Sequence, residues 1–112
     1  MEVPRGNERK PLVAAYELFG SALFVYMILV STSNAIAVPL ALFAMIIIFG
    51  GITGGHFNPA VTLGVFVAEC SSEKFKANLP TAVLVSLGQL IGALLGMLMA
   101  AFSLSANING SW

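Results

Sequence analysis

Charged residues are scarce in this chain. Of its 112 residues only 9% are Asp, Glu, Lys or Arg, and the five basic and five acidic side chains leave no net charge. A soluble domain carries roughly 25% charged residues, so the deficit indicates a surface that faces lipid. The sequence also contains no basic patch, which argues against nucleic acid as a partner.

Cysteine and metal-ligating residues are equally sparse. The single cysteine, Cys70, has neither a disulfide partner nor a CxxC motif and is expected to be a small, semi-buried side chain. The single histidine, His56, has no second ligand at a spacing that suits a metal. Because nucleophile–base pairs, cofactor motifs and phosphate-binding loops are also missing, the sequence predicts neither an enzyme nor a cofactor.

Apolar sequence is abundant: 58% of the residues are hydrophobic and the mean hydropathy is +0.93. Three stretches approach the roughly 20 residues of a membrane-spanning helix, at about 12–31, 35–51 and 79–104. The first stretch also has features of a signal peptide, but its length and its internal Glu17 favour a span. The sequence therefore predicts an all-α membrane protein with a short segment, 1–11, before the spans and a polar tail, 105–112, after them.

A glycine-rich, polar interruption separates the second and third stretches and reads Gly54-Gly55-His56-Phe57-Asn58-Pro59-Ala60-Val61-Thr62. Pro59 suits the first position of a helix and Asn58 the cap before it, so we expect a helix from Pro59 to about Ala68. At about 1.5 Å per residue it would cover about half of a hydrocarbon core roughly 30 Å thick. Irregular backbone at membrane depth survives only where protein buries it or a watery cavity borders it. Residues 52–68 are therefore predicted to form a re-entrant loop and half-helix.

The basic residues indicate an orientation. Three of the five precede the first span, and the other two, Lys74 and Lys76, lie in the polar segment 69–76. If the half-helix returns to the face from which it came, all five share one face of the membrane. The positive-inside rule then places the N-terminus in the cytoplasm.

Small residues in the third stretch predict a close helix contact. Gly88, Gly92 and Gly96 recur every four residues and therefore share one helix face. Glycines at this spacing let helices approach closely in lipid.

The interruption at 54–62 resembles the first signature loop of the aquaporin, or major intrinsic protein, family. Glu17 with Gly20-Ser21 is similar to the first-helix motif of that family, and Gln89 with Gly92-Ala93 is similar to its third-helix motif. The family fold has two inverted repeats, each with three spans and one half-helix. The resemblance covers about residues 13–102 and implies the first, N-terminal repeat only.

This resemblance implies a channel for the passive passage of water and small neutral solutes, in which a second repeat is needed. The sequence is then expected to be a fragment of a longer protein, because a lone half-channel would expose polar groups to lipid. A tetramer is also implied by the resemblance. The alternatives are a non-conducting membrane assembly subunit that keeps the half-fold for packing, and a solute transporter.

The resemblance also implies which residues line the pore or set selectivity: Gly54, Gly55, His56, Phe57, Asn58, Pro59, Ala60, Phe24 and Val38. The N-terminus of a helix carries about half a positive charge, so the half-helix and the Asn58 amide would repel cations and orient water. Residues 54–57, in an extended conformation, would expose a row of carbonyl oxygens to single-file permeants. Water-selective members often have an aromatic residue or histidine where Val38 stands, so valine leaves room for larger solutes.

Plainer interpretations of these residues stay open. Asn58 could be a helix cap and nothing more. His56 could be a buried histidine held by hydrogen bonds instead of a contact for the permeant. Phe24 and Val38 could belong to ordinary packing or face lipid.

Glu17 is an intramembrane carboxylate and needs a partner. The apolar stretches contain no Lys or Arg, so its donors should be backbone N–H groups of the loop near 54–57. The resemblance implies that Glu17 holds this loop with its carbonyls toward the pore. The alternative, a proton relay in a transporter, is poorly served by a single carboxylate. Gln89 is expected to satisfy polar groups of the loop or to bond to a neighbouring helix.

Overall fold

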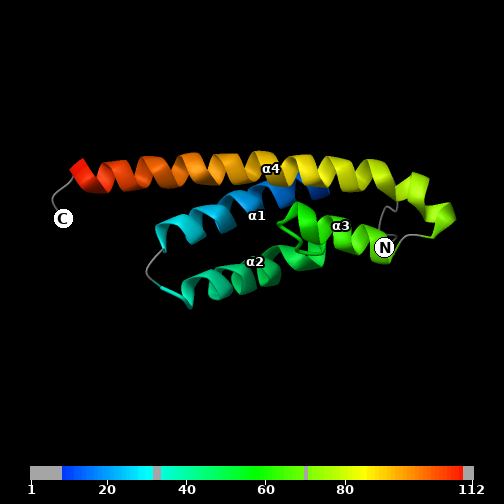
Figure 1. Cartoon of the computed structure of the whole chain (residues 1–112), viewed down its shortest axis with the longest axis horizontal. Helices are drawn as coiled ribbons and strands as arrows, with labels where there is room; N and C mark the ends of the chain where they lie inside the picture. The colour runs from blue at the N-terminus through cyan, green and yellow to red at the C-terminus, as the bar shows by residue number, and fades with distance from the viewer. Residues whose placement is uncertain (1–8, 32–33, 70, 110–112) are drawn as a thin grey trace.

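The computed structural model describes residues 9–31, 34–69 and 71–109, and every regular element among them is a helix. The four helices are α1 (Lys10–Val30), α2 (Ala37–Thr53), α3 (Pro59–Ala68) and α4 (Ser72–Asn109). In Figure 1, α4 runs the length of the molecule beside α1, α2 lies on the other side of α1, and α3 lies near the first half of α4. The all-helical fold class is confirmed for these residues.

Two of the helices are long and apolar enough to cross a membrane. They are α1, with 21 residues, and a 33-residue portion of α4 from Lys74 to Ala106. α2 is also apolar but has only 17 residues, about 25 Å at 1.5 Å per residue. The second apolar stretch is therefore a shorter helix than the other two, and the division of the chain into spans and loops stays a prediction.

α4 extends beyond the third apolar stretch at both ends. It begins at Ser72, inside the segment 69–76 that the sequence suggested as a polar loop, and it ends at Asn109, inside the expected polar tail. Glu, Lys and Ala residues favour helix, and a helix that has been nucleated propagates at little cost. The loss of hydrophobicity therefore marks the end of the apolar stretch without marking the end of the helix.

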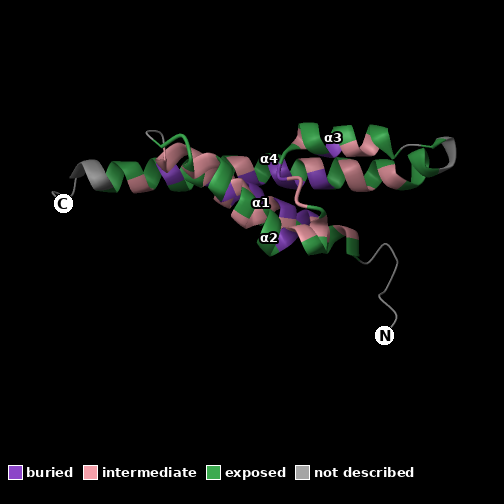
Figure 2. Ribbon diagram, turned by 90° about the horizontal axis from the view of Figure 1, so that it is seen from below, coloured by how far each residue is buried: buried purple, intermediate pink, exposed green. Residues whose placement is uncertain are grey.

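The core lies where α1 meets α4 (Figure 2), and it is built on the three glycines of α4. A Cβ atom on Gly88 would lie 2.8 Å from the carbonyl oxygen of Ala14, and Cβ atoms on Gly92 and Gly96 would overlap carbonyl oxygens of α1. The predicted close contact through small residues is thus confirmed. At the far end of the same pair of helices, the hydroxyls of Tyr26 and Ser103 lie 3.3 Å apart.

Large apolar side chains lie mostly on the outside. Ile47, Leu98 and Phe102 have exposed fractions of 69%, 65% and 79%, whereas the buried set includes Glu17, Ser21, Thr62 and Gln89. An apolar surface of this extent is a site for contact with lipid or with other protein. Three of these buried polar side chains, Glu17, Thr62 and Gln89, gather beside the loop between α2 and α3, which is the candidate functional site.

Candidate functional site

The loop between α2 and α3 has a turned backbone. Gly54 ends α2 in the left-handed region with φ of 91°, its N–H bonding to the carbonyl of Gly50 at 2.9 Å. Gly55 and Phe57 follow with φ of 68° and 49°. The expectation of an extended conformation for residues 54–57 is therefore wrong. Left-handed backbone suits the two glycines and is uncommon for phenylalanine.

The reason for the turned backbone is the convergence of its N–H groups. The N–H of His56 donates to Oε1 of Glu17 at 3.1 Å, and the N–H of Phe57 donates to Oε2 of the same carboxylate at 2.6 Å. In an extended chain, successive residues point to opposite sides, so two consecutive N–H groups could not reach one carboxylate. Thr53 supports the same turn, because its hydroxyl oxygen accepts from the N–H of Gly55 at 3.0 Å.

Glu17 is fully buried, with an exposed fraction of 0%. Its third donor is the side-chain amide of Gln89 on α4, whose Nε2 lies 2.7 Å from Oε2. All three partners are neutral donors, two from the loop and one from α4. Hydrogen bonds of this kind are what a buried carboxylate requires in the absence of a cation. The structure thus brings Glu17 to the loop N–H groups that the sequence analysis proposed as its donors.

Thr62 extends this network to the His56 ring, a role that the sequence analysis did not assign. Its hydroxyl lies 2.9 Å from Nε2 of Gln89, 3.1 Å from Oε1 of Gln89 and 3.1 Å from Nδ1 of His56. The exposed fractions of Thr62 and Gln89 are 4% and 1%. The sequence did contain a signal for this role. Thr62 follows Asn58 by one helical turn and lies on the same face of an otherwise apolar helix.

Phe57 turns its side chain into the protein. Its exposed fraction is 4%, and its ring lies where a side chain on Gly20 would be. The same ring meets Phe49 of α2 edge-on, with centroids 6.1 Å apart. The ring of Phe57 therefore anchors the loop to α1 and α2.

The start of α3 follows the Asn58-Pro59 pair as predicted. Asn58 is the N-cap with extended backbone, Pro59 occupies the first turn, and Oδ1 of Asn58 accepts from the N–H of Ala60 at 2.9 Å. This bond uses the oxygen of the Asn58 amide. Because Nδ2 has no partner in the part of the chain that the structure describes, the exposed amide keeps its two N–H donors available.

Phe24 and Val38 lie apart from this network. Both are half-buried, Phe24 in the second half of α1 and Val38 in the first turn of α2. Among the described residues, no hydrogen bond or ring contact joins either of them to the loop. Their assignment to the pore stays a prediction.

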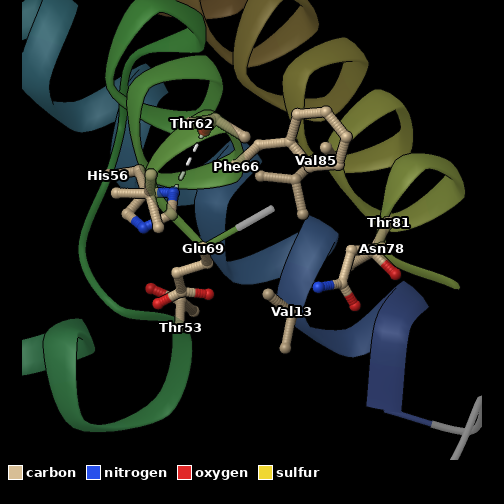
Figure 3. Close-up of a pocket in the computed structure, with 11 residues that line it drawn as sticks. Val13, Thr53, His56, Thr62, Phe66, Glu69, Asn78, Thr81 and Val85 are labelled. Atoms are coloured by element: carbon tan, nitrogen blue, oxygen red, sulfur yellow. Dashed lines mark hydrogen bonds between the residues drawn. The ribbon is translucent and has the colours of Figure 1, made fainter. Parts of the chain in front are cut away.

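A cavity of about 230 Å³ lies between α1, α3 and α4 and reaches the His56 ring. Figure 3 shows the side chains around it, with the bond from His56 to Thr62 drawn. Its polar lining comes from Thr53, His56, Thr62, Glu69, Asn78 and Thr81. His56 is thus half-exposed at one wall of a cavity while its Nδ1 side is tied to buried groups.

Comparison with known proteins gives the family. Residues 13–111 match the family model described as major intrinsic protein. The chain is 38% identical over 96 residues to Aquaporin-8 of Mus musculus, covering 75% of this chain and 34% of that protein. It is 36% identical over 88 residues to Probable aquaporin TIP1-2 of Oryza sativa, covering 70% of this chain and 32% of that protein. It is also 40% identical over 65 residues to Probable aquaporin PIP2-8 of Arabidopsis thaliana, covering 57% and 21%.

The chain therefore spans about a third or less of the length of these relatives. No solved structure matches it. The family match nevertheless covers nearly the whole chain, with the loop and its buried network inside it. The chain belongs to the major intrinsic protein family of membrane channels, the aquaporins, which are not enzymes.

Proposed function

We propose that this chain is the first repeat of a membrane channel through which water and small neutral solutes pass passively. In this proposal α3 is a half-helix that enters the membrane and returns to the same face, and the loop 54–57 lines the pore. The family supports a channel. The chain covers about a third or less of each matched relative, which supports the need for a second repeat that a longer protein or another chain supplies.

The observation that carries the proposal is the convergence of two loop N–H groups on the buried carboxylate of Glu17. Because Glu17 takes up N–H groups from one side of the loop, the carbonyl groups are left for the other side. Within the described residues, no hydrogen bond uses the carbonyl oxygen of any residue from 54 to 57. Unpaired acceptors in a membrane protein belong beside water or polar solutes, so these carbonyls are suited to a permeant.

Exclusion of ions follows from the start of α3. The free N–H groups at the N-terminus of a helix carry about half a positive charge, and the Asn58 amide adds two exposed donors at the same point. A water molecule there accepts from these donors and is oriented by them, which opposes a cation and breaks a hydrogen-bonded proton path. Val38 leaves room in the pore for solutes larger than water.

The arrangement of basic residues supports a cytoplasmic N-terminus. Arg9 and Lys10 lie at the start of α1, and Lys74 and Lys76 lie in the first turns of α4. Figure 1 shows these two helix starts toward one end of the molecule and the α1–α2 turn toward the other. By the positive-inside rule the first end faces the cytoplasm. A tetramer is proposed on family grounds alone.

Osmotic swelling of vesicles that contain the full-length protein tests this function. We expect water permeability above that of empty vesicles, uptake of a small neutral solute such as glycerol, and no passage of ions or protons. Equal swelling of loaded and empty vesicles for both water and glycerol would overturn the proposal.

A further inference from the structure

The orientation of the Gln89 amide is fixed by Glu17. A carboxylate oxygen accepts hydrogen bonds and has none to give, and Oε2 of Glu17 already accepts from the N–H of Phe57. The atom of Gln89 that lies 2.7 Å from this oxygen must therefore be the nitrogen Nε2. The reversed amide would set two oxygens against each other.

This orientation decides where the hydroxyl proton of Thr62 goes. The second hydrogen of Nε2 points to the Thr62 oxygen at 2.9 Å. The carbonyl oxygen of Gln89 is buried, and the Thr62 hydroxyl at 3.1 Å is its one donor among the described residues. A buried carbonyl without a donor is costly. The hydroxyl proton of Thr62 is therefore committed to Gln89.

The His56 ring must then donate. A hydroxyl has one hydrogen, so Thr62 cannot also donate to Nδ1 of His56 at 3.1 Å. That contact is a hydrogen bond only if Nδ1 carries a proton and the Thr62 oxygen accepts it. With this assignment the amide of Gln89, the hydroxyl of Thr62 and Nδ1 of His56 all have hydrogen-bond partners.

We propose that Thr62 and Gln89 are positioning residues that hold the neutral His56 ring with its proton on Nδ1, so that Nε2 presents a hydrogen-bond acceptor. Nε2, which has no hydrogen-bond partner among the described residues, lies beside Gly54, where an added Cβ would be 3.2 Å from it. Gly54 begins the run of unpaired loop carbonyls, so Nε2 adds one more acceptor to it.

The consequence for selectivity rests on the proposed channel function. Along residues 54–57, a lining of carbonyl oxygens and an unprotonated Nε2 accepts hydrogen bonds from the permeant, which meets donors only at Asn58 and the start of α3. It favours permeants that donate, such as water and alcohols, over neutral solutes that can only accept. The tautomer itself does not depend on conduction and can be measured separately.

Nitrogen-15 NMR of the full-length protein in lipid tests the tautomer directly. Spectra would be recorded at about pH 8, where a free imidazole is neutral, and the His56 signals identified as those lost in His56→Gln. Correlations from the carbon-bound ring protons distinguish the two nitrogens. We expect a protonated Nδ1 and an unprotonated Nε2. A protonated Nε2 in the unaltered protein would overturn the proposal, whether or not the vesicles swell.

Three variants test the positioning roles. Thr62→Ser keeps the hydroxyl and should keep the proton on Nδ1, whereas Thr62→Val removes the acceptor and should move the ring toward the Nε2–H tautomer that free histidine favours. Gln89→Met releases the Thr62 proton to donate to Nδ1, so it should also shift the proton to Nε2, although Gln89 does not touch the ring. An unchanged tautomer in folded Thr62→Val and Gln89→Met proteins would contradict the positioning roles.

Discussion

The carboxylate oxygen Oε2 of Glu17 lies 2.6 Å from the backbone nitrogen of Phe57, forty residues further along the chain. This contact joins the middle of α1 to the only left-handed residue of the loop that is not glycine. The conformation of the loop is therefore determined by a buried charge on another helix as well as by the local sequence.

Replacement of Glu17 by glutamine should destabilise the protein and lower permeability together. Three donors surround the carboxylate, and a glutamine would turn its own NH₂ group toward at least one of them. A hydrogen bond to a charged group contributes about 1.5–3 kcal/mol, so the free energy of unfolding should fall by at least that amount. Folding yield in detergent and vesicle swelling are the measurements.

Glu69→Gln provides the matched control for folding. It makes the same chemical change at an exposed carboxylate that has no bond to the loop within the described residues, and yield should be unaltered. A Glu17→Gln protein with normal yield and normal permeability would rule out the supporting role of Glu17.

Gly92→Ala should disrupt the contact of α1 with α4. Its Cβ would overlap the carbonyl oxygen of Leu18, and a backbone atom cannot move aside as a flexible side chain can. Overpacking of this kind costs about 1–3 kcal/mol. Gly51→Ala is the control, since no atom lies within 4 Å of the added Cβ and alanine is favoured over glycine in helices by about 1 kcal/mol. Thermal unfolding in detergent should rank Gly51→Ala at or above the unaltered protein and Gly92→Ala below it.

Gly20 and Phe57 should be energetically coupled. A methyl group at Gly20 would occupy the place of the Phe57 ring, so Gly20→Ala should displace the ring and, with it, the loop. Phe57→Leu in the same chain should relieve part of the loss. A double-mutant cycle should give a coupling free energy of about 0.5–3 kcal/mol. The pair Gly20→Ala and Phe66→Leu should be additive, because Phe66 packs on Phe75, and additivity of both pairs would refute the contact.

Most of the features that the sequence predicted have a local cause. The start of α3 follows from the Asn58-Pro59 pair, and the helix contact follows from glycines at a four-residue spacing. The donors to Glu17 could be anticipated because the apolar stretches offered no cation. Each of these inferences needed only the spacing of residues and the physical chemistry of a membrane.

What the sequence did not reveal depends on contacts between distant residues. The left-handed backbone of Phe57 arises from the carboxylate of Glu17 on another helix, and no local preference of phenylalanine points to it. The bond between Gln89 and Glu17 joins residues 72 positions apart, and Thr62 takes part only because both helices bring partners to it. The length of α4 was also missed, because a polar segment can continue an apolar helix.

The proposal that residues 52–68 form a re-entrant segment, which returns to the membrane face at which α2 ends, is tested most directly by the accessibility of introduced cysteines. Single cysteines at Asn34, in the α1–α2 turn, and at Lys76, in the first turns of α4, would be labelled with an impermeant thiol reagent in sealed vesicles of the full-length protein, after its native cysteines have been replaced. We expect labelling from opposite faces, with position 76 on the cytoplasmic side. Labelling of both positions from the same face would mean that α3 crosses the membrane, and the re-entrant pore loop would be contradicted.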